Sequence, residues 1–173
     1  MTRYFRIKLL KFAIYSAVVF SLFIIQSTPG VLDFCGINPN LVLPACICIA
    51  IFEGEFVGGL FGFFAGIFCD TAAETIFGFN AFFYLLFCSA VGLLTIYFLR
   101  RDTMNAMLLC FGGIFLTAFA DFFFGYVLYQ YSGLTGFFYT VIVPPVLYSS
   151  IFSLPFYYLF LWLHEKFEAD PVN

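Results

Sequence analysis

Residues 80–99 form a run of twenty residues without a charged side chain. At a rise of about 1.5 Å per residue, a helix of this length spans the ~30 Å hydrocarbon core of a bilayer. The rest of the chain is similarly apolar, since 64% of its 173 residues are hydrophobic and 10% are charged. A soluble domain of this size has too little interior to bury so many apolar side chains. The sequence therefore predicts an all-α membrane protein with a single polytopic domain, residues 1–173.

Six transmembrane helices in a compact bundle account for the apolar segments. Residues 39–76 are too long for one helix and carry Glu53 and Glu55 in the middle, so we divide this segment there. Its two halves are short, and either two full crossings or one re-entrant hairpin fits them. The predicted helices cover residues 7–25, 39–52, 56–76, 80–99, 104–128 and 137–163.

The basic residues indicate how the bundle is oriented. They fall in three places: Arg3, Arg6, Lys8 and Lys11, then Arg100 and Arg101, then Lys166. With six segments and a cytoplasmic N-terminus, all three places lie on the cytoplasmic side, as the positive-inside rule requires. We therefore expect both termini in the cytoplasm. The net charge of −3 offers no basic surface for nucleic acid.

A ladder of glycines begins where the segment 39–76 is divided. Gly54, Gly58, Gly62 and Gly66 recur every four residues. Residues at this spacing lie along one side of a helix, and glycine allows two helix backbones to approach closely. The ladder predicts a seam of close helix contact, either within the bundle or with a helix of a partner protein.

Two acids fall in the expected outer half of the membrane. Asp70 continues the glycine spacing, and Asp121 lies about seventeen residues into the helix 104–128. The chain has no Lys or Arg in this half, and an unpaired carboxylate there must be solvated, protonated, hydrogen-bonded or paired with another molecule. A Pro-Pro pair in the helix 137–163 predicts a kink at a similar depth. The sequence thus predicts an outer polar pocket formed by Asp70, Asn80, Asp121, Pro144, Pro145 and Tyr148.

Catalytic motifs are missing from the sequence. It has no H-E-x-x-H, phosphate-binding or dinucleotide-binding motif, and its one histidine, His164, lies near the expected cytoplasmic end. We expect no enzymatic activity, no cofactor and no metal site.

Several motifs resemble those of the MreD family of bacterial rod shape-determining membrane proteins. They are Asn38-Pro39-Asn40-Leu41, the glycine ladder with Gly59, Phe63 and Asp70, Gly78-Phe79-Asn80-Ala81 with Tyr84, and Pro144-Pro145-Val146-Leu147-Tyr148 with Pro155. The resemblance covers residues 35 to 165. It implies a fold similar to the substrate-binding components of energy-coupling factor vitamin transporters.

The resemblance also implies a function and partners. MreD-like proteins lie in the bacterial cytoplasmic (inner) membrane and bind MreC, a single-pass membrane protein. With MreB, RodA and a transpeptidase they form the elongation complex, or elongasome, that directs lateral peptidoglycan synthesis and cell shape. The expected function is thus a non-enzymatic scaffold subunit. A vitamin-binding transporter subunit, favoured by Ala13 and Ala17, and an ion or proton carrier using Asp70 and Asp121 are the alternatives.

Overall fold

The computed structural model describes residues 3–28, 30, 39–72, 77–99, 101–124 and 143–168, and helices are the regular secondary structure in these ranges. The helices are α1 (Arg3–Ser27), α2 (Val42–Glu53), α3 (Glu55–Ala72), α4 (Phe79–Tyr97), α5 (Thr103–Phe122) and α7 (Val143–Glu168). The prediction of an all-α chain with six helices is confirmed for these residues. Parts of three predicted helices, residues 73–76, 125–128 and 137–142, lie outside the described ranges.

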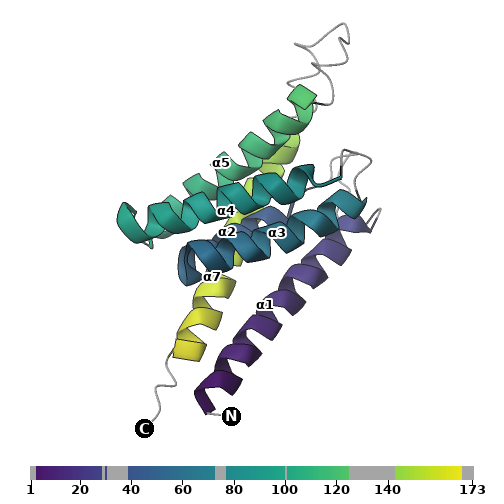
Figure 1. Ribbon diagram of the computed structural model, residues 1–173. Helices are drawn as coiled ribbons and strands as arrows, with labels where there is room; N and C mark the ends of the chain where they lie inside the picture. The colour runs from purple at the N-terminus through teal and green to yellow at the C-terminus, as the bar shows by residue number, and fades with distance from the viewer. Residues whose placement is uncertain are drawn as a thin grey trace, which may run out of the picture.

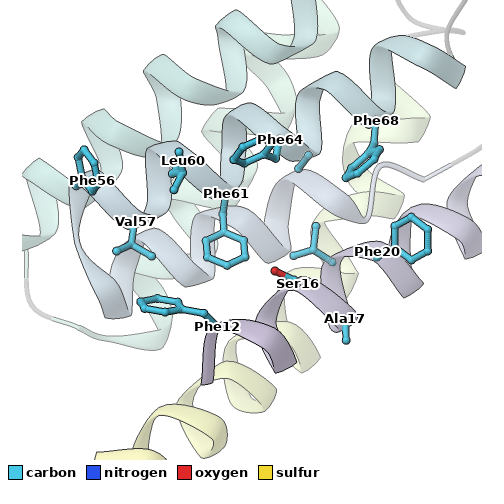
Figure 2. A pocket seen from close by; sticks show the side chains of 12 residues that line it. Phe12, Ser16, Ala17, Phe20, Phe56, Val57, Leu60, Phe61, Phe64 and Phe68 are labelled. Carbon is cyan, nitrogen blue, oxygen red and sulfur yellow. The ribbon is translucent and has the colours of Figure 1, made fainter. Parts of the chain in front are cut away.

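Five of the described helices are long and apolar enough to cross a membrane, and α2 is shorter. The chain is therefore a multi-pass membrane protein. Large apolar side chains such as Phe56, Phe98 and Met104 are exposed, as a bundle surrounded by lipid allows. In Figure 1, α3 and α4 lie side by side, and the start of α1 is at the same end of the bundle as the end of α7. A groove lies between α1 and α3 (Figure 2).

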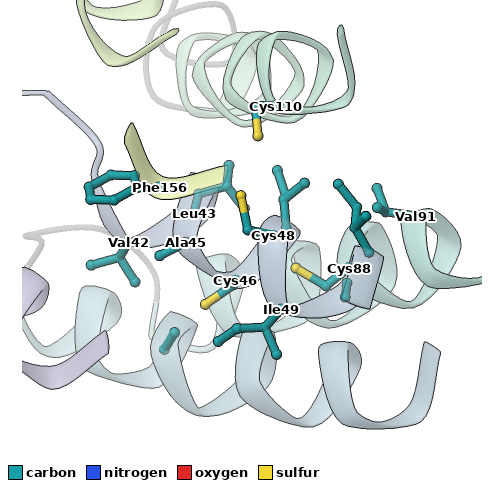
Figure 3. Packing of buried hydrophobic residues seen from close by; sticks show 14 of the residues in the cluster. Val42, Leu43, Ala45, Cys46, Cys48, Ile49, Cys88, Val91, Cys110 and Phe156 are labelled. Atoms are coloured by element: carbon teal, nitrogen blue, oxygen red, sulfur yellow. The ribbon is translucent and has the colours of Figure 1, made fainter. Parts of the chain in front are cut away.

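The short helix α2 forms the core. It contacts all five other described helices, and every residue from Val42 to Phe52 is buried. Its side chains are apolar all round, which suits a helix without a lipid-facing or water-facing side. Cys46 and Cys48 of α2 pack here with Cys88 of α4 and Cys110 of α5, all as free thiols (Figure 3). With twelve residues α2 is about 18 Å long, so it is a protein-enclosed helix rather than a lipid-facing span.

Side chains from outside α2 satisfy its first backbone N–H groups. The Gln26 Oε1 atom of α1 accepts hydrogen bonds from the backbone N–H groups of Leu41 (2.8 Å) and Val42 (3.2 Å). The Asn40 Oδ1 atom accepts one from Leu43 N–H at 3.2 Å. These bonds stabilise a buried helix end whose donors have no partner within the helix. They also fix the start of α2 beside the end of α1, so the two helices run antiparallel.

Candidate functional site

The glycine ladder lies at contacts between the chain's own helices. A Cβ atom on Gly58 would lie 2.3 Å from Ala50 Cβ of α2. One on Gly62 would lie 2.7 Å from the Tyr84 carbonyl oxygen of α4, and one on Gly66 would lie 2.4 Å from Ala81 Cα of α4. Since these distances leave no room for a side chain, glycine is what lets α3 approach α2 and α4 so closely.

Gly54, the first glycine of the ladder, has a different setting. It lies between α2 and α3 with a φ of 91°, a backbone conformation that residues other than glycine rarely adopt. Among the described residues, a Cβ atom there would meet only Ile96 Cδ1, at 3.5 Å. Gly54 therefore makes the reversal between α2 and α3, whereas the next three glycines make the close contacts.

Asp70 caps the start of α4. The residue is 3% exposed. Its carboxylate accepts hydrogen bonds from the backbone N–H groups of Gly78 (3.0 Å), Asn80 (3.0 Å) and Ala81 (3.1 Å). The residue that precedes α4 is Gly78, which has no side chain to cap the helix, so Asp70 of α3 satisfies these donors instead. Its negative charge also interacts favourably with the helix N-terminus. This arrangement joins α3 to α4 at the end of the glycine seam.

Replacing Asp70 with asparagine is expected to lower the free energy of unfolding by about 1–3 kcal/mol, because an amide group would face backbone donors that now meet a carboxylate oxygen. Thermal unfolding of the detergent-purified protein measures the change. Asp102→Asn is the matched control, since Asp102 precedes α5, is exposed and forms no capping hydrogen bond. Equal melting temperatures for the two variants would contradict the capping role.

A polar cavity of about 340 Å³ lies beside this cap. Asn40 donates a hydrogen bond through Nδ2 to the Tyr84 hydroxyl at 2.7 Å, and its backbone N–H donates to Ser149 Oγ at 2.8 Å. The segment before α2 is thereby joined to α4 and α7. The cavity is lined by Phe23, Gln26, Ser27, Pro39, Asn40, Cys69, Ala72, Asn80, Tyr84 and Asp121.

The predicted outer polar pocket matches this cavity only in part. Asn80 and Asp121 belong to the lining, whereas Asp70 lies next to it as the α4 cap. Pro144 and Pro145 are outside the described lining. They lie in the first turn of the described part of α7, where proline is tolerated because the first N–H groups lack partners within the helix. Tyr148 packs against Phe152, with ring centroids 5.4 Å apart. The proline inside α7 is Pro155.

A charged cluster at the opposite end of α2 was not predicted as a site. Lys11 of α1 forms an ion pair with Glu53 Oε1, and the Tyr15 hydroxyl donates a hydrogen bond to the same oxygen at 3.1 Å. His164 Nδ1 of α7 lies 3.1 Å from Glu53 Oε1, and its Nε2 lies 3.4 Å from an Arg101 guanidinium nitrogen. The cluster joins α1, α2, α7 and the segment before α5 around one carboxylate.

The sequence contained a signal for this cluster. The predicted topology puts Lys11, Glu53 and His164 at the same membrane face, and the three types of side chain can form ion pairs and hydrogen bonds. In the sequence, Lys11 serves only to indicate the orientation of the bundle, and His164 only lies near the expected cytoplasmic end. The contact between them is not evident because they are 153 residues apart in sequence.

The groups available in these sites can bind a ligand or stabilise the fold. Within the described ranges, no group of three His, Cys, Asp or Glu side chains could hold a metal ion. The polar cavity offers amide, hydroxyl and carboxylate groups from α1, α4, α5 and the segment before α2. The charged cluster has its carboxylate already engaged with Lys11, Tyr15 and His164.

Comparison with protein families matches residues 6–167 to the family described as rod shape-determining protein MreD. The chain belongs to the MreD family. No curated protein and no solved structure matches it. The resemblance to the MreD family inferred from sequence motifs is therefore confirmed, and it covers almost the whole chain. Membership identifies a shape-determining membrane protein rather than a member of a known enzyme family.

Several of the motifs that indicate the MreD family lie in one part of the fold. Gly62 and Gly66 form the seam with α4, Asp70 caps α4 at the end of that seam, and Asn80 and Tyr84 line the polar cavity. These motif residues, which are separated along the chain, are thus neighbours in the folded bundle. In this MreD-family chain, the seam, the cap and the cavity are one continuous region.

Proposed function

We propose that this chain is a non-enzymatic scaffold subunit of the bacterial elongation complex, where it binds an MreC-like single-pass membrane protein. In this role it supports MreB-directed lateral peptidoglycan synthesis and cell shape, with RodA and a transpeptidase as direct or indirect partners. The observation that carries the proposal is the MreD-family match over residues 6–167. The bundle supports it, because the charged cluster around Glu53 and the close glycine contacts join its helices into a frame.

The proposed location is the bacterial cytoplasmic membrane, with both termini in the cytoplasm. The charged cluster supports this orientation, since Lys11 and Arg101 approach His164 at one end of the bundle. Gln26 at the cavity and Lys11 at the cluster are fifteen residues apart on α1, which is about 22 Å along the helix axis. In the proposed orientation, the cluster faces the cytoplasm and the polar cavity lies toward the outer face.

The scaffold proposal is tested by purifying the tagged full-length protein gently from its native membranes and identifying bound proteins by mass spectrometry. We expect an MreC-like single-pass protein and wall-synthesis enzymes to be enriched over a tagged, unrelated multi-pass protein from the same membranes. Deletion of the MreC-like gene should then remove the wall-synthesis enzymes that bind through it. Absence of any such protein from the purified sample would contradict the scaffold role.

The alternative is a substrate-binding subunit of an energy-coupling factor vitamin transporter. The polar cavity of about 340 Å³ supports it, because small-molecule sites are of roughly 300–1,000 Å³ and have a few well-placed polar groups. In that case the same purification would recover a pair of ATPases and a coupling membrane subunit. Saturable vitamin binding to the purified protein would be the second sign.

A further inference from the structure

The groove between α1 and α3 is a large apolar surface next to the polar cavity. Its volume is about 780 Å³, and Figure 2 shows Phe12 and Phe20 of α1 facing Phe61 and Phe68 of α3 across it. Ser16 and Ala17 are small residues on the α1 side, so the groove is open between the rings. Both helices are membrane-spanning candidates, and a groove at this depth is accessible to lipid.

The groove and the cavity meet at Phe68. The Phe68 ring lies 5.8 Å from the ring of Phe20, which lines the groove, and 5.6 Å from the ring of Phe23, which lines the cavity. Cys69, the next residue of α3, also lines the cavity. One face of α1 and α3 therefore presents a long apolar surface that ends in a compact polar site. This arrangement is complementary to an amphipathic ligand, which has an apolar chain and a polar end.

The charge of the polar end selects among amphipathic ligands. Asp121 is exposed, and among the described residues that line the cavity it is the one carboxylate. No Lys or Arg occurs in the whole sequence between residues 12 and 99 or between residues 102 and 165, so the chain supplies no cation at this end. Within the described ranges, Asp121 forms no ion pair. A carboxylate near lipid is stabilised by a cation that also donates hydrogen bonds.

We propose that the cavity and the groove together bind a phospholipid with a primary-ammonium headgroup, such as phosphatidylethanolamine. The ammonium group pairs with the Asp121 carboxylate. The amide groups of Gln26 and Asn40 line the same cavity and can form hydrogen bonds with the rest of the headgroup. One acyl chain lies along the groove between α1 and α3. A lysine of a partner protein carries the same positive charge. A phospholipid accounts both for the carboxylate and for the apolar groove that continues from it.

Lipid retention by the purified full-length protein tests this proposal. The protein is reconstituted in nanodiscs containing equal amounts of phosphatidylethanolamine and phosphatidylcholine, and the lipids that remain bound after transfer to detergent are counted by native mass spectrometry. Phosphatidylcholine carries a quaternary ammonium group, which cannot donate a hydrogen bond to Asp121. We expect roughly tenfold preferential retention of phosphatidylethanolamine, the effect of one charge-assisted hydrogen bond.

Two variants, each with a matched control variant, separate the headgroup site from the acyl-chain site. Asp121→Asn should abolish the preference, while Asp102→Asn, a change of an exposed acid near the other end of α5, should preserve it. Ala17→Phe fills the groove and should reduce retention of both lipids, whereas Ala13→Phe adds the same ring at an exposed α1 position outside the groove lining and should not. Equal retention of the two lipids by the unmodified protein, or an unchanged preference in Asp121→Asn, would overturn the proposal.

Cross-linking in native membranes distinguishes the source of the cation. A carbodiimide couples a carboxylate to a nearby primary amine without a spacer, so mass spectrometry of the peptide that contains Asp121 identifies its neighbour. A phosphatidylethanolamine adduct is the expected product. A lysine-containing peptide of another protein as the main adduct would overturn the lipid assignment, and this outcome is independent of which proteins co-purify.

Discussion

Gly62→Leu is expected to prevent α3 and α4 from packing together and to leave little folded protein. A Cβ atom at position 62 already lies 2.7 Å from the Tyr84 carbonyl oxygen, and backbone on the facing helix cannot move aside as a flexible side chain can. Overpacking a tight contact costs about 1–3 kcal/mol or more, a large part of the stability of a small domain. The measurement is the monodisperse fraction in size-exclusion chromatography, together with the melting temperature.

Gly112→Leu is the matched control for this change. Gly112 lies in α5, and a Cβ atom there would have no atom of the described residues within 4 Å. The same chemical replacement in another membrane helix should therefore leave folding intact. Equal behaviour of the two variants would mean that the seam tolerates a side chain, and the close approach of α3 and α4 would then not depend on glycine.

Lys11→Met is the second change with a large expected effect. It removes one ion-pair partner of Glu53, whose side chain is 13% exposed, and leaves His164 and Tyr15 on the carboxylate. Breaking a buried pair by removing one member costs about 3–5 kcal/mol, and we expect a loss toward the lower end of this range because these two partners remain. We expect the attachment of α1 to the charged cluster to weaken to the Tyr15 hydrogen bond, and the protein to unfold at lower denaturant concentration. Denaturant titration of the detergent-purified protein, followed by intrinsic fluorescence, measures the loss.

A double variant distinguishes loss of the pair from loss of a long side chain. Glu53→Gln combined with Lys11→Met removes both charges and should recover part of the stability, because no uncompensated carboxylate remains. Arg6→Met, which removes an exposed charge from the same helix, should have little effect. If the double variant is less stable than Lys11→Met alone, the ion pair is not the source of the stabilisation.

Much of the fold was predictable because the solvent is lipid. Helices that cross a bilayer need long apolar segments, and a run such as residues 80–99 satisfies that requirement without reference to the rest of the chain. The glycine ladder was predictable for a similar reason, since its spacing alone puts Gly58, Gly62 and Gly66 along one side of a helix. Both features depend on residues close together in sequence.

The candidate sites depended on contacts between distant segments and were predicted less well. Asp70 was recognised as an acid that needs a partner, but its partners are backbone groups of α4 that no pattern of side chains reveals. Gln26 has nothing unusual in its own segment, yet it binds the start of α2. Asn80 and Asp121 do line one cavity, because α4 and α5 bring them there.

The enclosed helix α2 has a consequence for how the protein is made. Segments leave the ribosome in order from the N-terminus, so α2 enters the membrane before α4, α5 and α7, three of the five helices that surround it, have been synthesised. With about 18 Å of helix, it is too short to cross the bilayer as an independent segment. Its final environment exists only once the last helix has arrived, so completion of the C-terminal half governs the maturation of the N-terminal half.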